Sequence, residues 1–114
     1  MGFKENFGES ERANESKKII FKYPSRIPII VERYKDCSLN EINKNKYLVP
    51  KDLTMGQFVG IIRKRINLDP AQALFIMINN KLVPNVESMG TIYENEKNID
   101  GFLYLVYTSE NTFG

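Results

Sequence analysis

No histidine occurs among the 114 residues, and the chain has a single cysteine. Without imidazole it lacks the commonest general base and metal ligand, and any Cys-His or Ser-His nucleophilic pair. Cys37 cannot form an intrachain disulfide, which fits a reducing compartment, so we expect a cytoplasmic protein. Because Cys37 lies in a polar stretch with no obvious activating group, we interpret it as a loop or strand-edge thiol. We therefore expect neither an enzyme nor a cofactor or metal site.

An excess of one charge is also missing, since the formal net charge is only +2. Nucleic-acid-binding proteins usually concentrate basic residues on one face, so we expect no nucleic-acid partner. No apolar run approaches the length of a transmembrane helix. With 42% hydrophobic and 26% charged residues, the composition is typical of one globular domain, which we expect to be monomeric.

Residues 1–24 are predicted to form a helical extension that ends before Pro24. The segment 10–23 contains neither glycine nor proline, and Ser10 is a plausible N-cap ahead of Glu11. The side expected to face the protein carries Ala13, Ile19, Ile20 and Tyr23. The basic residues Lys17, Lys18, Lys22 and Arg26 are typical of a solvated helix face.

Strands are predicted at 27–33, 46–50, 73–80 and 101–108, with residues 81–83 as a short additional piece. The first is nearly all apolar and should be a central strand with Pro28 near its beginning. In the second, Tyr47 and Val49 should share one face and Leu48 the other. Asn79 and Asn80 tolerate left-handed backbone and predict a turn. We expect an α+β protein with a four-stranded mixed sheet.

The clearest local signal is a capping box, in which Thr54 is followed three residues later by Gln57. It predicts the start of an amphipathic helix. The apolar stripe that should face the sheet consists of Phe58, Ile61, Ile62 and Ile66. A second short helix or turn is expected after Ser88.

The order of these elements, with a helical extension in front, is that of a ubiquitin-like β-grasp domain. Together with the motifs YPSRIPIIVER, KYLVPKDLT, IIRKRI, MGTIY, DGFLY and a final FG, it resembles the autophagy ubiquitin-like modifiers of the GABARAP and microtubule-associated light chain three type. The resemblance runs from about residue 12 to Gly114. It implies a β-grasp domain over 25–110 and a flexible conjugation tail over 111–114.

The resemblance further implies that the carboxylate of Gly114 is joined to phosphatidylethanolamine on autophagosomal membranes. Activating and conjugating enzymes of the autophagy system would carry out this transfer. In many relatives a cysteine protease first removes residues that follow this glycine. A residue without Cβ suits passage through narrow enzyme channels.

Members of the family hold short receptor motifs, an aromatic residue followed three positions later by an aliphatic one, along the second strand. Matched by position, the aromatic pocket would be lined by Glu15, Ile19, Pro28, Lys46, Leu48 and Phe102. The aliphatic pocket would be lined by Tyr47, Val49, Pro50, Leu53, Phe58 and Ile61. Arg26, Lys44, Lys46 and Arg65 would attract acidic residues that flank such a motif.

An alternative function stays open at this point. The chain could be a ubiquitin-fold interaction module that is never conjugated and binds tubulin or a trafficking factor through its basic N-terminal helix. In that case the tail would be dispensable, and recognition would depend on Lys17, Lys18 and Arg26.

Overall fold

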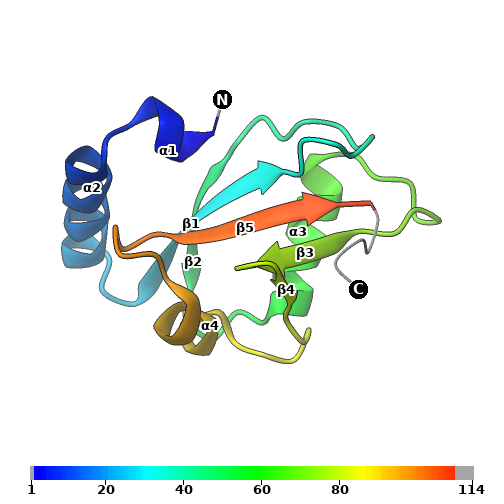
Figure 1. The fold of residues 1–114 in the computed structure, drawn as a ribbon. Helices are drawn as coiled ribbons and strands as arrows, with labels where there is room; N and C mark the ends of the chain where they lie inside the picture. The colour runs from blue at the N-terminus through cyan, green and yellow to red at the C-terminus, as the bar shows by residue number, and fades with distance from the viewer. Residues whose placement is uncertain (1, 110–114) are drawn as a thin grey trace.

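The computed structural model describes residues 2–109, which form helices at one end and on both faces of a single sheet (Figure 1). In chain order the elements are α1 (Phe3–Asn6), α2 (Glu9–Lys22), β1 (Arg26–Arg33), β2 (Lys46–Pro50), α3 (Met55–Arg65), β3 (Phe75–Ile78), β4 (Lys81–Leu82), α4 (Met89–Glu96) and β5 (Leu103–Thr108). Within this range no helix is both long enough and apolar enough to cross a bilayer.

The sheet has five strands in the order β2-β1-β5-β3-β4, one more than the four we predicted. The central strands β1 and β5 are parallel, and every other pair is antiparallel. The additional strand is the two-residue β4, which pairs with β3 after the predicted turn. Asn79 and Asn80 have φ angles of 51° and 65°, so both adopt the left-handed conformation expected of them.

The main core lies between α3 and one face of the sheet. Phe58 and Ile62 of α3 are completely buried against Ile29 and Leu103 of the central strands, as the apolar stripe predicted. Ile61 is an exception, because 36% of its surface is exposed. Successive residues of a helix point about 100° apart, so Ile61 points well away from the direction of buried Ile62 and lies at the margin of the apolar stripe.

The N-terminus of α3 has the predicted capping box. The Thr54 hydroxyl accepts a hydrogen bond from the Gln57 amide at 3.2 Å, and the Gln57 side chain accepts one from the Thr54 amide at 2.9 Å. Two backbone donors that the helix leaves unpaired are thereby satisfied. Ser88 caps α4 in a similar way, also as predicted.

The second helix, α2, differs from the prediction at its start and on its inner side. It begins at Glu9 with Gly8 as N-cap, and Glu11 accepts a hydrogen bond from the Gly8 amide at 3.3 Å, so Ser10 is not the cap. Ile20 and Tyr23 are exposed, whereas the polar Ser16 is buried. Ala13 and Ile19 are half-buried, as predicted. The rest of the inner side was mispredicted because it is set by a polar contact that hydrophobic periodicity does not detect.

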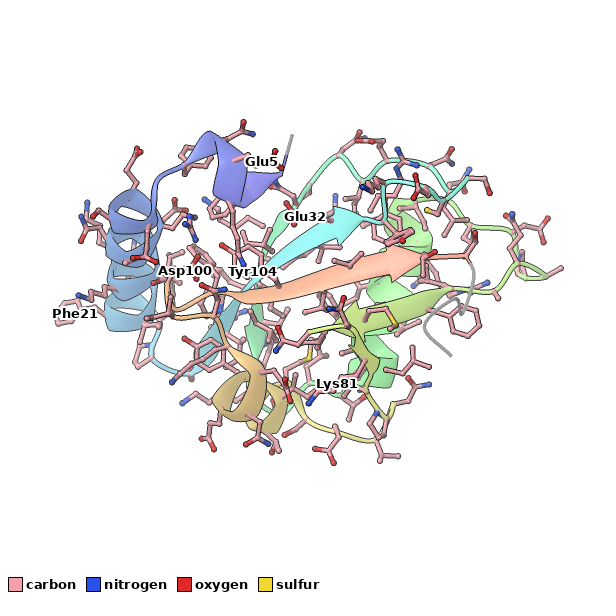
Figure 2. The ribbon with its side chains drawn as sticks, in the orientation of Figure 1. Glu5, Phe21, Glu32, Lys81, Asp100 and Tyr104 are labelled. Carbon is pink, nitrogen blue, oxygen red and sulfur yellow. The ribbon has the colours of Figure 1, made fainter. Side chains whose placement is uncertain are left out.

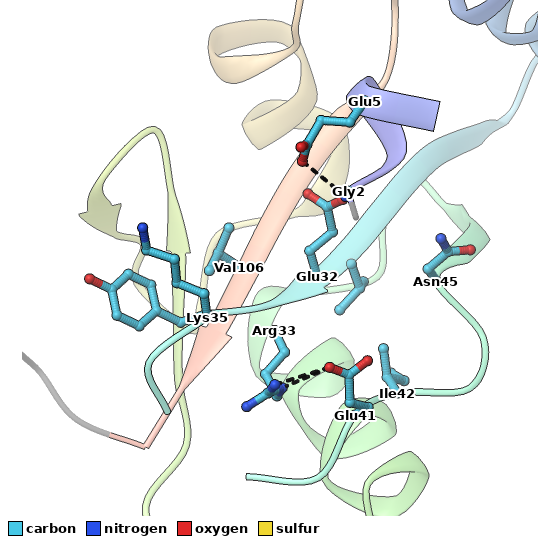
Figure 3. Close-up of a pocket in the computed structure, with 11 residues that line it drawn as sticks. Gly2, Glu5, Glu32, Arg33, Lys35, Glu41, Ile42, Asn45 and Val106 are labelled. Carbon is cyan, nitrogen blue, oxygen red and sulfur yellow. Dashed lines mark hydrogen bonds and ion pairs between the residues drawn. The ribbon is translucent and has the colours of Figure 1, made fainter. Parts of the chain in front are cut away.

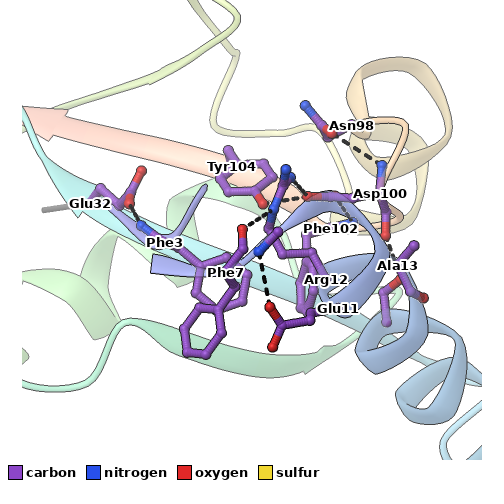
Figure 4. Close-up of polar contacts among 12 residues, drawn as sticks. Phe3, Phe7, Glu11, Arg12, Ala13, Glu32, Asn98, Asp100, Phe102 and Tyr104 are labelled. Atoms are coloured by element: carbon purple, nitrogen blue, oxygen red, sulfur yellow. Dashed lines mark hydrogen bonds and ion pairs between the residues drawn. The ribbon is translucent and has the colours of Figure 1, made fainter. Parts of the chain in front are cut away.

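That polar contact centres on Asp100, a buried aspartate between α4 and β5 (Figure 4). Its carboxylate accepts hydrogen bonds from Arg12 Nη1 and the Tyr104 hydroxyl, both at 2.5 Å, and from the Phe102 amide at 2.9 Å. Its backbone carbonyl accepts one from Ser16 Oγ at 2.5 Å. Burial, followed by the hydrogen bond to Asp100, raises the pKa of the Tyr104 phenol. Asp100 therefore joins α2 to the centre of the sheet.

Gly101 allows this close approach. Its φ angle is +90°, and a Cβ at this position would lie 2.4 Å from Ser16 Oγ. Any larger residue would be strained and would push α2 away from the sheet.

The capping box yields a stability prediction. Thr54→Ala should lower the free energy of unfolding by about 1 kcal/mol, because the Gln57 amide loses its acceptor. Urea unfolding followed by circular dichroism measures this change. Thr54→Ser keeps the hydroxyl and should stay close to the parent chain. Equal midpoints for Thr54→Ala and the parent would show that the cap contributes nothing.

The Asp100 network yields a second prediction. Asp100→Ala should destabilise the chain more than Thr54→Ala does, because three donors lose one shared buried acceptor. The measurement is the same urea titration, with the exposed Asp52→Ala as the matched control. A loss no larger than that of Asp52→Ala would contradict the proposed role of Asp100 in holding α2.

Candidate functional site

Strand β2 forms one edge of the sheet, as the peptide-binding prediction requires. The amide of Val31 donates to the carbonyl of Asn45 at 2.7 Å, which marks residues 31 and 45 as a hydrogen-bonded antiparallel pair. In an antiparallel ladder, hydrogen-bonded pairs alternate with non-hydrogen-bonded pairs. The pairs Ile30–Lys46 and Pro28–Leu48 are therefore of the non-hydrogen-bonded type. Pro28 has no amide hydrogen and fits such a pair. The backbone amides and carbonyls of Lys46 and Leu48 therefore point away from β1, toward the open edge.

One of these edge groups already has a contact. Arg26 Nη1 lies 3.4 Å from the carbonyl oxygen of Leu48, which is a long hydrogen bond. This contact places the Arg26 guanidinium beside the open edge, where we predicted a cation. A peptide strand added here would share or replace this contact.

The predicted aromatic-pocket residues lie on the face of the sheet that α1 and α2 cover. The register places Pro28, Leu48 and Lys46 on this face. From α2, Glu15 forms an ion pair with Lys46, and half-buried Ile19 packs beside Phe102. Phe102 itself is completely buried. Partial burial also lowers the pKa of Lys46. All six predicted residues thus belong to one side of the β2 edge.

The aliphatic-pocket residues lie on the opposite face, against α3, with one exception. Tyr47 and Val49 are buried, and the rings of Tyr47 and Phe58 meet edge to face with centroids 5.5 Å apart. Leu53 packs against the same core, and Ile61 lies at its margin. Pro50, by alternation along β2, belongs with Lys46 and Leu48 instead.

Tyr47 combines burial with an unpaired polar atom. Its hydroxyl is buried and has no hydrogen-bond partner among residues 2–109. Burial raises the pKa of this phenol, and the positive charge of Arg65 opposes the shift. Lys44 lies over the ring, with its ammonium 5.0 Å from the centroid. Two of the predicted cations therefore flank the aliphatic side of the site.

This arrangement fits a motif with its two anchors three positions apart. In an extended strand, residues i and i+3 point to opposite faces and lie about 10 Å apart along the chain. A strand paired with β2 would direct its first anchor toward Leu48 and its second toward Val49. The geometry is compatible with binding, which remains a prediction for each of these residues.

A cavity of about 620 Å³ lies elsewhere, beside the C-terminal half of β1 (Figure 3). Four of its five charged lining residues, all except Lys35, already have a partner within the described part of the protein. Glu32 accepts a hydrogen bond from the Phe3 amide at 2.7 Å, and Arg33 is paired with Glu41 at 3.0 Å. Within the described residues, no group of three carboxylate or thiol side chains is placed to hold a metal ion. We assign no ligand to this cavity.

Gly114, the predicted conjugation residue, lies outside the described residues. Phe3, which the sequence did not indicate, packs with Phe102 and Ile30 in a small buried cluster next to the aromatic side of the site. Phe3 and Phe7 share one four-residue spacing, which is too short a pattern to predict a buried face, so only its contacts single out Phe3.

Comparison with known proteins agrees with the geometry. The family model described as "Autophagy protein Atg8 ubiquitin like" matches residues 11–114. The chain is 53% identical to "Autophagy-related protein 8" of Schizosaccharomyces pombe over 98% of this chain and 93% of that protein. It is 47% identical to "Autophagy-related protein 8h" of Arabidopsis thaliana over 98% of this chain and 94% of that protein.

A solved structure supports the same assignment. The crystal structure of Trypanosoma brucei ATG8 superposes with a TM-score of 0.91 at 38% sequence identity, covering 100% of this chain and 98% of that one. The fold, the edge strand and the sequence agreement lead to one conclusion: this chain belongs to the Atg8 family of autophagy-related ubiquitin-like proteins.

Proposed function

We propose that the chain is a modifier, conjugated through Gly114 to phosphatidylethanolamine on autophagosomal membranes, that recruits cargo receptors and adaptors there. The proposal that the chain recruits receptors is supported by the open edge of β2. The predicted pocket residues are divided between the two faces of the sheet at this edge. Residues 25–110 would be the binding domain, and residues 111–114 the tail that reacts. Family membership is the support for conjugation.

Lipid attachment accounts for membrane residence without any spanning segment. Each buried methylene contributes about 0.8 kcal/mol, and a single acyl chain is only marginally sufficient for binding. Phosphatidylethanolamine has two chains, so the conjugate would stay on the membrane. The activating and conjugating enzymes, and the cysteine protease of the system, are the expected partners for the tail.

Peptide binding needs more than the two anchors. Burying an aromatic and an aliphatic side chain supplies about 3 to 6 kcal/mol, whereas micromolar affinity corresponds to about 8 kcal/mol. Ordering the peptide adds a further cost. Hydrogen bonds to the edge groups of Lys46 and Leu48, and attraction of acidic flanking residues to Arg26, Lys44 and Arg65, would provide the remainder.

Conjugation is tested by reconstitution. Incubation with the cognate activating and conjugating enzymes, ATP and phosphatidylethanolamine liposomes should add the mass of one lipid minus water, as measured by mass spectrometry. Deleting Gly114 should abolish the product. Cys37→Ser should leave it unchanged, because the chain's own thiol takes no part in the transfer. Absence of product from the intact chain, or its persistence without Gly114, would refute the conjugation half.

Motif binding is tested at the β2 edge. Leu48→Arg should weaken binding of a Trp-x-x-Leu peptide by at least about tenfold, because it places a charge where an apolar ring must be buried. Fluorescence anisotropy with a labelled peptide measures the dissociation constant. The matched control is Leu82→Arg on β4 at the opposite edge of the sheet, where the leucine is already exposed. Equal affinities for both variants would refute the assigned edge.

The alternative of a charge-based interaction module has a specific observation in its favour. Lys17 and Lys18 are exposed, and neither forms an ion pair with a residue in the 2–109 range. Binding of tubulin or a trafficking factor that is abolished by reversing Lys17, Lys18 and Arg26, yet unaffected by Leu48→Arg, would favour it. The same set of variants thus separates the two functions.

A further inference from the structure

Phe3 of α1 is a buried aromatic residue next to the proposed peptide site (Figure 4). Only 4% of its surface is exposed. Its ring meets Phe102 nearly edge to face, with centroids 5.2 Å apart, and lies 6.4 Å from the ring of Tyr104. The ammonium of Lys46 lies 5.5 Å from the centroid of Phe3. Phe3 therefore contacts two of the residues predicted to line the aromatic pocket.

The strand register locates Phe3 relative to that pocket. Pro28 pairs with Leu48 and, if the β1–β5 register is continued by one residue, with Phe102. These three residues form one row across the sheet. Ile30 pairs with Lys46 and Tyr104 and forms the next row. Since Phe3 packs with Ile30, Phe102 and Tyr104, it covers the second row and borders the first. Phe3 is thus beside the pocket and does not occupy it.

The position of Phe3 is set by a hydrogen bond to the sheet. Its amide donates to Glu32 Oε2 at 2.7 Å, which joins α1 to β1 across 29 residues of sequence. The close approach depends on Gly2, because a Cβ there would lie 2.9 Å from the same carboxylate oxygen. Glu32 and Phe3 are on different elements, and Figure 4 shows the two joined at the N-terminal end of α1.

Lys46 covers the boundary between Phe3 and the pocket. Its ammonium lies over the Phe3 ring while it pairs with Glu15 of α2, so it bridges the two helices that flank the site. An aromatic side chain that entered between α2 and β2 would displace the ammonium and meet the Phe3 ring. Aromatic rings favour such edge contacts at centroid distances of roughly 4.5 to 7 Å.

We propose that Phe3 is a wall of the aromatic pocket, against which the ring of a bound motif packs, and that Glu32 is the residue that positions it. This inference rests on the proposed peptide-binding function. It assigns part of the specificity for the motif's aromatic residue to α1. A large indole reaches further toward Phe3 than a benzene ring does, so the wall favours tryptophan over phenylalanine at that position.

The test measures the affinities of two peptides, Trp-x-x-Leu and Phe-x-x-Leu, for the full chain and its variants. Phe3→Ala should weaken binding of the tryptophan peptide by about two- to tenfold. It should weaken binding of the phenylalanine peptide less, so that the preference for tryptophan falls. Glu32→Ala should shift the preference in the same direction to a smaller extent. Phe21→Ala is the matched control, since Phe21 is 90% exposed on α2 and should change neither value.

A purely structural role for Phe3 predicts a different result, namely equal weakening of both peptides with an unchanged preference. That result, or tighter binding by Phe3→Ala, would overturn the inference. Nuclear Overhauser contacts between the peptide indole and the Phe3 ring in the unaltered chain give a second readout that does not depend on the stability of a variant. Their absence would also overturn it. The proposed function fails separately, if the unaltered chain binds neither peptide or binds both independently of Leu48.

Discussion

The antiparallel register between β1 and β2 is the constraint on which the site depends. Because Val31 and Asn45 form a hydrogen-bonded pair, alternation turns the backbone groups of Lys46 and Leu48 outward. The same register places Leu48 and Val49 on opposite faces of the sheet. Sliding β2 by one residue along β1 would exchange the two faces and turn the outward groups inward, and neither predicted pocket would keep its lining. Pro28 lacks an amide hydrogen, and its nitrogen lies on the side of β1 that faces away from β2, so it removes no hydrogen bond between these two strands.

Buried Asp100 holds α2 against the sheet through two groups. Its carboxylate accepts a hydrogen bond from Arg12, and its backbone carbonyl accepts one from Ser16. The helix α2 in turn brings Glu15 and Ile19 to the side of the sheet where the aromatic pocket is predicted. A charge in this position is compatible with folding because the carboxylate oxygens have donors from a guanidinium, a phenol and a backbone amide. Figure 2 shows Asp100 and Tyr104 facing each other between α2 and β5, whereas Phe21 projects from the far side of the helix. The candidate site is therefore supported by a polar contact that holds α2 and by the apolar packing of α3 against the sheet.

Local signals in the sequence predicted the elements whose ends depend on neighbouring residues. The capping box of Thr54 and Gln57, the turn at Asn79 and Asn80 and the cap at Ser88 each involve residues within four positions of one another. Their geometry is decided by short-range hydrogen bonds and backbone preferences, and the residue types at these positions predict both. The start of α2 was missed because a glycine served as N-cap and Glu11 reached back to it, a less common form of the same motif.

By itself the sequence determined the strands, the long helix and the resemblance to a family, because apolar periodicity and dense motifs are properties of the chain as written. Only the tertiary structure decided that Phe3 packs beside Phe102 and Lys46 of the predicted aromatic pocket, that Ser16 faces inward and that Asp100 contacts both α2 and β5. These contacts join residues far apart in sequence, 88 positions in the case of Arg12 and Asp100. No local preference encodes such a pair, since its formation depends on the whole sheet first bringing the two segments together.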